Sequence, residues 1–236
     1  MATPIKQTCA IVGIGPGNGR ALVKRFTQEG YDVAMLSRDP DYLQEMEQAY
    51  PSARGYPCDA TEEQAVRQAF QQIEHDLGPV WTLVYNAGAG VFKSAEDCTA
   101  EEFEQTWRVN TLGLFNASRA ALPQLRQHDQ ANLMVTGASA AWRGRARTAP
   151  FASAKAAQRS LAQSLARQLG PENIHVGYLV IDGVIDLPRT RKMLPDKPDD
   201  FFIQADAVAD AIWTLCQQPR SGWTFELDLR PFGESW

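Results

Sequence analysis

Short apolar runs alternate with longer amphipathic stretches along nearly the whole chain of 236 residues. The apolar runs predict strands over 8–14, 31–37, 53–59, 80–88, 131–139, 174–182 and 223–229. The amphipathic stretches predict helices over 19–30, 40–50, 61–78, 99–127, 149–169 and 205–218. This order predicts a single α/β domain spanning 1–236, with a doubly wound, mostly parallel sheet of about seven strands.

Polar residues near the ends of the predicted helices refine these boundaries. Two pairs have the spacing of a capping box, Thr61 with Gln64 and Thr99 with Glu102, and each would begin a helix. Pro123 is expected to kink or break the helix over 99–127. The segment 183–204 is rich in proline and charge, which predicts a loop or a small lid rather than a linker between domains.

Composition and charge argue against several classes of protein. The hydrophobic content of 44% is enough for a sizeable core, and the net charge of −5 argues against nucleic acid as the main partner. No apolar run approaches the ~20 residues of a membrane span. The first residues lack the apolar core of a secretory signal. We therefore expect a cytoplasmic protein that does not bind membranes.

Cysteines and histidines form no recognisable metal site or nucleophilic triad. The cysteines are widely spread and are expected to be reduced, buried side chains: Cys9, Cys58, Cys98 and Cys216. The histidines are equally scattered: His75, His128 and His175. Candidate chemistry therefore has to come from other motifs.

The segment "VGIGPGNGR" joins the first predicted strand to the first predicted helix. Its glycines at positions 13, 15, 17 and 19 let the backbone turn tightly and approach a ligand closely. The helix that follows presents unpaired N–H groups and the positive end of its dipole, which suits a phosphate. Asn18 stands where the usual GxGxxG motif has its last glycine, so the spacing from Gly13 is GxxxGxG instead.

Further motifs in the right order make the chain resemble the short-chain dehydrogenase/reductase family over essentially its whole length. Asn86-Ala87-Gly88 follows the fourth predicted strand, Asn110 stands in the next helix, and Lys155 ends the family's Tyr-x-x-x-Lys motif. The resemblance implies a Rossmann fold and an oxidoreductase that binds a dinucleotide, with Asp59 near the adenine. The loop and the resemblance together assign these residues to the cofactor: Gly13, Gly15, Pro16, Gly17, Asn18, Gly19, Ser37, Arg38, Asp59, Ala60, Asn86, Ala87, Gly88, Thr136, Lys155, Gly183 and Ile185.

The end of the second predicted strand indicates which dinucleotide is preferred. A carboxylate there would bind the ribose 2′-hydroxyl of NAD, but the sequence has Ser37 followed by Arg38. The forked guanidinium of Arg38 can pair with the 2′-phosphate of NADP, so we predict NADP over NAD. Alternatively, Arg38 is a solvated surface charge that the neighbouring Asp39 offsets.

The reaction centre departs from the family at the residue that donates the proton. Phe151 stands where the family has its tyrosine, while Lys155 keeps the lysine that, by resemblance, holds the nicotinamide ribose. Residues four apart on a helix share a face, so both side chains point the same way. By resemblance, Asn110 supports Lys155 through backbone and water contacts. Loss of a general acid typically costs about 10²–10⁴ in rate, so we expect an atypical proton donor or weak activity.

Two further departures lie nearby. With the family's spacing, Ala138 takes the place of the catalytic serine, although Ser139 or Thr136 could still point inward. The family's Pro-Gly turn beside the nicotinamide is Asp182-Gly183 here. Because ligands bind at the carboxyl ends of parallel strands, we consider Asp182 or Ser139, directly or through water, as the replacement acid. Alternatively, Asp182 only caps a turn.

Two positively charged segments flank this centre. They contain Arg143, Arg145 and Arg147, and Arg189, Arg191 and Lys192. Such runs are usually solvated, but if they border the site they would attract an anionic substrate or a carrier-bound acyl group.

The sequence thus predicts an NADP-dependent oxidoreductase that acts on a carbonyl/alcohol pair with an atypical proton donor. One alternative is a catalytically weak or inactive NADP-binding protein, acting as a sensor or partner subunit. Another is a lyase, epimerase or dehalogenase that reuses the pocket without hydride transfer. The resemblance also implies a homodimer or homotetramer, joined through the two long central helices, with a possible contribution from the apolar segment 221–236.

Overall fold

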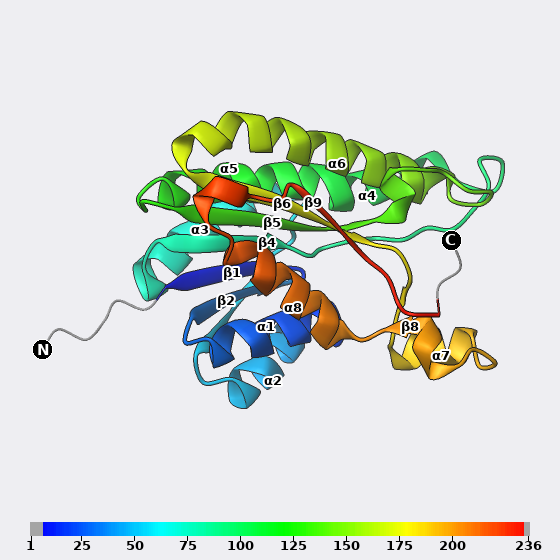
Figure 1. Ribbon diagram of the computed structural model, residues 1–236, viewed down its shortest axis with the longest axis horizontal. Helices are drawn as coiled ribbons and strands as arrows, with labels where there is room; N and C mark the ends of the chain where they lie inside the picture. Colours follow the sequence, from blue (N-terminus) through cyan, green and yellow to red (C-terminus); the bar gives the residue numbers. More distant parts are fainter. Residues whose placement is uncertain (1–6, 234–236) are drawn as a thin grey trace, which may run out of the picture.

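The computed structural model describes residues 7–233. Residues 1–6 and 234–236 lie outside the description, and 234–236 are the last residues of the segment 221–236 that is predicted to contribute to the oligomer contact. The strands of the main sheet are β1 (Thr8–Val12), β2 (Asp32–Ser37), β3 (Ala53–Pro57), β4 (Val80–Tyr85), β5 (Ala131–Ala138), β6 (Ile174–Ile181) and β9 (Glu226–Leu229). Within the described chain they form one parallel sheet in the order β3-β2-β1-β4-β5-β6-β9 (Figure 1). The predicted seven-stranded, doubly wound α/β fold is confirmed.

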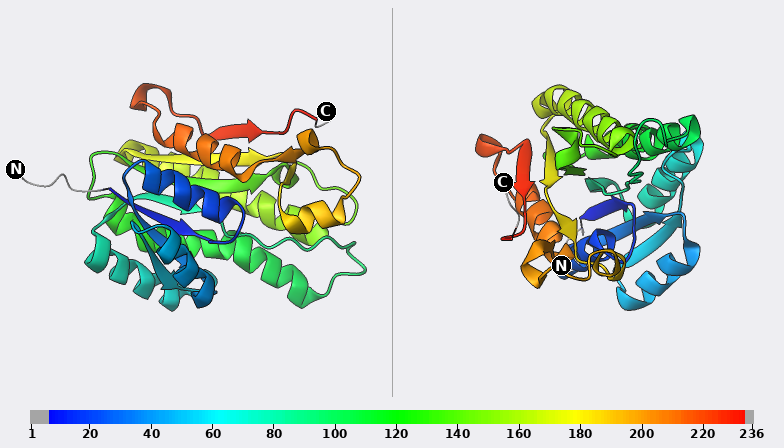
Figure 2. Two further views of the ribbon diagram at one scale, coloured as in Figure 1. Left: turned by 90° about the horizontal axis from the view of Figure 1, so that it is seen from below. Right: turned by 90° about the vertical axis from the view of Figure 1, so that its right-hand side faces the viewer.

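Helices cover both faces of this sheet. They are α1 (Asn18–Gln28), α2 (Pro40–Ala49), α3 (Glu63–Leu77), α4 (Ala100–Trp107), α5 (Gly113–Leu125), α6 (Ala149–Leu169), α7 (Pro188–Met193) and α8 (Ala205–Cys216). One face carries α1, α2 and α8, and the other carries α3, α5 and α6, with α4 packed against α6 (Figures 1 and 2). Because both faces are covered, the strands are apolar on both sides.

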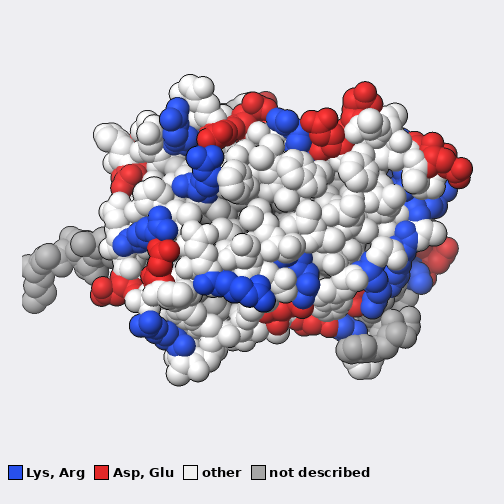
Figure 3. Space-filling view, turned by 90° about the horizontal axis from the view of Figure 1, so that it is seen from above, with Lys and Arg blue, Asp and Glu red and all other residues white. Residues whose placement is uncertain are grey.

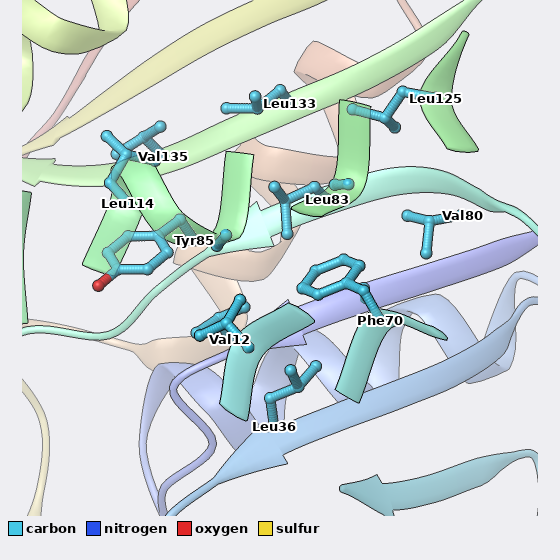
Figure 4. Close-up of a cluster of buried hydrophobic side chains, with 14 of the residues drawn as sticks. Val12, Leu36, Phe70, Val80, Leu83, Tyr85, Leu114, Leu125, Leu133 and Val135 are labelled. Atoms are coloured by element: carbon cyan, nitrogen blue, oxygen red, sulfur yellow. The ribbon is translucent and has the colours of Figure 1, made fainter. Parts of the chain in front are cut away.

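The alternation of side chains along β1 shows how one strand serves two cores. Cys9 and Ile11 pack with α1 and α8, whereas Ala10 and Val12 pack on the other side with α3 and α5. Figure 4 shows the second core, in which Val12 lies among side chains from β2, β4 and β5 and from the covering helices. These buried layers fix the carboxyl ends of the strands, where ligands bind in sheets of this kind.

The structure bears out one predicted helix start and corrects another. Thr99 and Glu102 form the predicted capping box at the start of α4. The predicted box at Thr61 is wrong, because α3 begins at Glu63 and the backbone N–H and hydroxyl of Thr61 both donate to Asp59 Oδ1 instead. A nearby aspartate offers the backbone a local partner that competes with the helix cap.

The long helix between β4 and β5 is irregular at a different place from the one predicted. It runs on through Pro123 and ends only two residues later, at Leu125. Pro123 removes one intrahelical hydrogen bond, because it has no N–H to donate to the carbonyl four residues earlier, yet the helix continues through it. A π-helical turn, Arg108–Leu112, instead joins α4 to α5. Such turns often occur at functional sites, and this one contains Asn110.

The segment 183–204 has a small structure of its own. Two short strands, β7 (Val184–Ile185) and β8 (Phe202–Ile203), pair in parallel, and α7 lies between them. Arg191 forms ion pairs with Asp186 and Asp199, and its guanidinium lies 4.1 Å from the centre of the Phe202 ring. These contacts make Arg191 a structural residue of the segment.

The described residues also bear on the expectations about membrane spans and about the cysteines. Over 7–233, no helix is both long and apolar enough to cross a membrane. None of the four cysteines is in a disulfide, and Cys9, Cys58 and Cys216 are buried. Burial raises the pKa of the Cys58 thiol to about 11, so this side chain is protonated near neutral pH. Cys98 is only partly buried, in contrast to the prediction.

Candidate functional site

A cavity of about 670 Å³ opens at the carboxyl ends of β1 and β4. It lies where the chain order of the sheet reverses, since β1 is followed outward by β2 and β3 on one side and by β4 and β5 on the other. The cavity brings together these residues assigned to the cofactor from the sequence: Gly13, Gly15, Pro16, Gly17, Asn18, Gly19, Ser37, Arg38, Asp59, Ala60, Asn86, Ala87, Gly88 and Ile185. Thr136, Lys155 and Gly183 do not line it.

The loop between β1 and α1 requires glycine at two points. Gly13 has a φ of +97°, and a Cβ there would overlap the backbone of Ala87 at the end of β4. A Cβ at Gly19 would lie 2.8 Å from the Cα of Ile14, within the same loop. Gly15, by contrast, has open space around it. The loop can therefore fold closely over the sheet while leaving its backbone accessible to a ligand.

A hydrogen-bond network fixes the loop to the sheet. The Asn86 side chain donates from Nδ2 to the Gly13 carbonyl at 2.7 Å, and its Oδ1 lies 3.2 Å from the Thr136 hydroxyl. The Thr136 hydroxyl also lies 3.3 Å from the Tyr85 carbonyl. Thr136 is therefore committed to bracing Asn86 and does not take the place of the family's serine.

The end of β2 presents a cation without a counter-ion. The Ser37 hydroxyl donates to the Ile14 carbonyl at 3.3 Å, which joins β2 to the glycine loop. Arg38 lines the cavity and is exposed, and in the described part of the chain it has neither an ion pair nor a side-chain hydrogen bond. Asp39 does not offset it, because the Asp39 carboxylate accepts the backbone N–H of Tyr42 and caps α2.

Asp59 lies across the cavity from this loop, in the turn between β3 and α3. Its Oδ1 accepts two hydrogen bonds from Thr61, each of 2.9 Å, so the carboxylate is held in place by its own turn. The carbonyl of Ala60 accepts the side-chain amide of Asn116 at 3.1 Å. Helix α5 therefore supports the turn that positions Asp59.

Lys155 is buried on the first half of α6. Its Nζ donates to the Thr136 carbonyl at 3.1 Å and to Gln158 Oε1 at 2.9 Å. Burial lowers the pKa of Lys155 to about 7. No carboxylate among residues 7–233 pairs with the ammonium to oppose this effect. A lysine with such a pKa can be either charged or neutral near physiological pH, which is unusual outside functional sites.

Asn110 and Gly88 link Lys155 to the wall of the cavity. The buried Asn110 side chain donates to the carbonyls of Ala89 and Thr106, both at 2.8 Å, while its Oδ1 has no partner among the described residues. A Cβ added to Gly88, which lines the cavity, would lie 3.4 Å from that Oδ1 and 3.9 Å from Lys155 Nζ. An unpaired acceptor and an ammonium therefore lie next to a residue of the cavity wall.

Phe151 and Ser139 occupy the two remaining positions of the predicted centre. The Phe151 ring packs against Phe92, with the ring centres 5.1 Å apart, and Phe92 itself is 59% exposed. Ser139 begins a short 3₁₀ turn after β5, and its hydroxyl has no hydrogen-bond partner within 7–233. The centre thus has an apolar wall where a phenol is expected, beside a free hydroxyl.

Asp182 is buried at the end of β6 between two arginines. Its Oδ2 lies 3.6 Å from the guanidinium of Arg143 and 3.6 Å from that of Arg230. Both ion pairs engage the same carboxyl oxygen within the protein. This geometry argues against Asp182 as the replacement acid. Arg143 is engaged in this pairing, so it is not a free charge for a substrate.

The segment 183–204 contributes residues that the sequence analysis did not assign to the cofactor. A Cβ on Gly17 would lie 2.8 Å from the side chain of Leu187, so this leucine packs directly over the glycine loop. Arg189 lines the cavity and has no ion pair with any described residue. The positively charged run in the sequence was the available signal for Arg189, but only the fold separates it from the structural Arg191.

Comparison with known sequences identifies the family. The sequence model of the short chain dehydrogenase family matches residues 7–197, which is most of the chain. The chain therefore belongs to the short-chain dehydrogenase family. The 3-oxoacyl-[acyl-carrier-protein] reductase MabA of Mycobacterium bovis is 29% identical over 190 residues, which cover 80% of this chain and 73% of that protein.

Solved structures agree with this assignment. A short-chain dehydrogenase from Rhodopseudomonas palustris is 32% identical, with a TM-score of 0.81 over 96% of this chain and 99% of that one. An alcohol dehydrogenase from Thermococcus sibiricus, solved with 5-hydroxy-NADP, has a TM-score of 0.86 at 24% identity and covers 98% of both chains. The second likeness concerns the fold alone.

Proposed function

We propose that this chain is an NADP-dependent oxidoreductase that interconverts a carbonyl compound and an alcohol. The observation that supports it most is the cavity beside the glycine loop, which Arg38 lines as a cation without a counter-ion among residues 7–233. Membership of a dehydrogenase family supports the reaction class. The NADP analogue in the Thermococcus sibiricus neighbour supports the choice of cofactor only as an analogy of fold.

The residues around the cavity suit a dinucleotide. The tight approach at Gly13 and the open backbone at Gly15 leave the loop free to bind a pyrophosphate. Arg38 would bind the 2′-phosphate and Asp59 the adenine, while Lys155 would hold the nicotinamide ribose. The unpaired Oδ1 of Asn110 fits the same assignment, since a buried acceptor without a partner is costly. Bound NADPH would supply the hydride for carbonyl reduction.

The chain itself has to supply the proton. Phe151 has none to give, and the Asp182 carboxyl group is already engaged by Arg143 and Arg230. We assign the source of this proton to Lys155, because an ammonium with a pKa of about 7 can release a proton from Nζ near neutral pH. Since Lys155 does not line the cavity, water would carry the proton from Nζ to the substrate oxygen. In this scheme the free hydroxyl of Ser139 orients the substrate oxygen.

Side chains near the centre support a substrate with an apolar part and an anionic part. Phe92 and Phe151 form an apolar wall beside Lys155. The side chains of Arg145 and Arg147 are exposed and make no ion pair or hydrogen bond with the described chain. A carrier-bound or otherwise anionic acyl substrate fits both features. The mycobacterial relative, named as a 3-oxoacyl-[acyl-carrier-protein] reductase, gives one substrate class to test.

The second candidate is an NADP-binding protein with little or no turnover. The observation that favours it is Phe151, which removes the family's proton donor. The two candidates are separated by following NADPH oxidation with a panel of ketones, aldehydes and 3-oxoacyl thioesters, for wild type beside Lys155→Met. Turnover by wild type that the variant lacks supports an enzyme. NADPH binding without turnover on any carbonyl supports the inactive protein.

We also propose that the chain assembles as a homodimer or homotetramer through the two long central helical segments, α4 with α5 and α6. Three large apolar side chains on these helices are well exposed: Phe103 at 44%, Trp107 at 39% and Phe115 at 41%. The face of the molecule that carries α4, α5 and α6 has a broad uncharged centre, with Lys and Arg gathered toward its margins (Figure 3). Light scattering after gel filtration tests this, and a monomeric wild type would contradict it.

A cytoplasmic location and the role of 183–204 as a lid stay predictions.

A further inference from the structure

The side chain of Gln158 is completely buried between the lysine of the centre and the π-helical turn. Its Oε1 accepts the Lys155 ammonium at 2.9 Å, and its Nε2 donates to the Asn110 backbone carbonyl at 2.9 Å. The Tyr178 hydroxyl from β6 lies 3.4 Å from the same Oε1. One amide therefore connects α6, the turn between α4 and α5, and the sheet.

The orientation of this amide follows from its partners. An ammonium can only donate and a carbonyl can only accept, so the oxygen must face Lys155 and the nitrogen must face Asn110. The opposite orientation would place two donors together at one end and two acceptors together at the other. A methionine of similar length offers neither the acceptor nor the donor. The geometry therefore uses both ends of the glutamine amide.

We propose that Gln158 is a positioning residue that holds the Lys155 ammonium in place by tying it to the backbone carbonyl of Asn110. The sequence analysis expected a water between Asn110 and Lys155, and the structure has the Gln158 side chain there. The importance of this link for cofactor binding rests on the proposed function, but the link itself does not. Because Phe151 offers no hydroxyl to fix the ammonium from the other side, the amide carries more of that task.

The groups that face Lys155 are mostly neutral. They are the Thr136 carbonyl from β5, the Gln158 amide and the Phe151 ring from α6, and the backbone at Gly88. The titratable Tyr178 reaches the same amide oxygen, and burial raises its pKa well above its ordinary value, so it stays neutral. The ionisation of Lys155 therefore reports directly on the side chain at position 158.

The test uses three variants of the full chain. Gln158→Met removes both hydrogen bonds at similar length, and Gln158→Glu keeps the acceptor but adds a charge. Gln168→Met is the control, because this exposed glutamine lies on the same helix and has no side-chain hydrogen bond within 7–233. The readouts are the ¹⁵Nζ shift of Lys155 against pH in the cofactor-free protein, assigned with Lys155→Met, and the affinity for NADPH and NADH.

The expected results differ for each variant. Gln158→Glu raises the pH midpoint of Lys155, because a carboxylate stabilises the ammonium, whereas Gln158→Met lowers it. Gln158→Met also weakens NADPH and NADH binding alike, by about tenfold, while Gln168→Met changes nothing. If both position-158 variants fold and leave the midpoint where it is in wild type, the inference is overturned. If wild type binds neither nucleotide, the proposed function fails, but the midpoints still decide on Gln158.

Discussion

On one face of α6, the Phe151 ring lies one helical turn before Lys155, with its centre 6.0 Å from the lysine Nζ. The pair keeps the spacing of a phenol and the lysine that would lower its pKa, but the phenol oxygen is missing. The ring packs against Phe92 instead. The centre thus retains its cation and its shape while losing its usual acid, which leads to predictions that separate binding from turnover.

Phe151→Tyr should raise carbonyl reduction if the centre is otherwise competent. The ring is only partly buried, so a hydroxyl can be added with little effect on folding. We expect kcat to rise at least about tenfold, because a positioned general acid typically contributes 10²–10⁴. The control is Phe92→Tyr, which adds a hydroxyl to the neighbouring exposed ring. Equal rates for wild type and Phe151→Tyr would show that the hydroxyl cannot reach the substrate.

Lys155 should make the stability of the protein depend on pH. Burial lowers its pKa from 10.5 to about 7, so between these values the unfolded chain binds one more proton than the folded chain. Stability contributed by this group therefore rises with pH across that window and is flat below pH 7. Relative to Lys155→Met, the free energy of unfolding of wild type should rise by about 1.4 kcal/mol per pH unit. Urea unfolding from pH 6 to 10 measures this, and parallel profiles for the two proteins would contradict it.

Arg38→Ala should change the choice of nucleotide. Arg38 has no counter-ion in the described chain, so its charge is available to a 2′-phosphate. We expect NADPH to bind about 10- to 100-fold more weakly to the variant, while NADH binding changes little. Arg67→Ala is the control, because this exposed arginine on α3 does not line the cavity and has no ion pair within 7–233. A similar loss for both nucleotides would mean that Arg38 acts on something other than the phosphate.

The glycine loop offers a matched pair of substitutions. Gly13→Ala places a methyl group against the Ala87 backbone at a positive φ, and should destabilise the protein by about 3 kcal/mol or more. Gly15→Ala meets nothing within 4 Å and should leave the melting temperature unchanged. If Gly13→Ala and Gly15→Ala have the same melting temperature, the loop does not have the described conformation.

The sequence predicted what depends on local pattern. Continuous apolar runs identified most strands of the main sheet, because a strand covered on both faces is apolar on both sides. The last strand was identified from the alternation of polar and apolar residues over 223–229. The places of Arg38 and Gly13 beside the cavity also followed from motif and place in the chain. The strands β7 and β8 were not predicted, since each is only two residues long and is defined by its pairing partner.

The missed parts of the site depend on contacts between distant segments. Gln158 is joined to Asn110 across 48 residues, and Leu187 reaches the glycine loop from the far end of the chain. Nothing in the local sequence marks either residue. The capping box at Thr61 failed for a related reason, because the spacing was right but Asp59 competed for the same groups.

The most direct test of the central claim is a fluorescence titration of the purified wild-type protein with NADPH and, in parallel, with NADH. The account predicts that NADPH binds at least about tenfold more tightly than NADH, since only NADPH carries a 2′-phosphate that can pair with Arg38. Equal affinity, or a preference for NADH, would contradict the proposed cofactor. Failure to bind either nucleotide would contradict the proposed function as a whole.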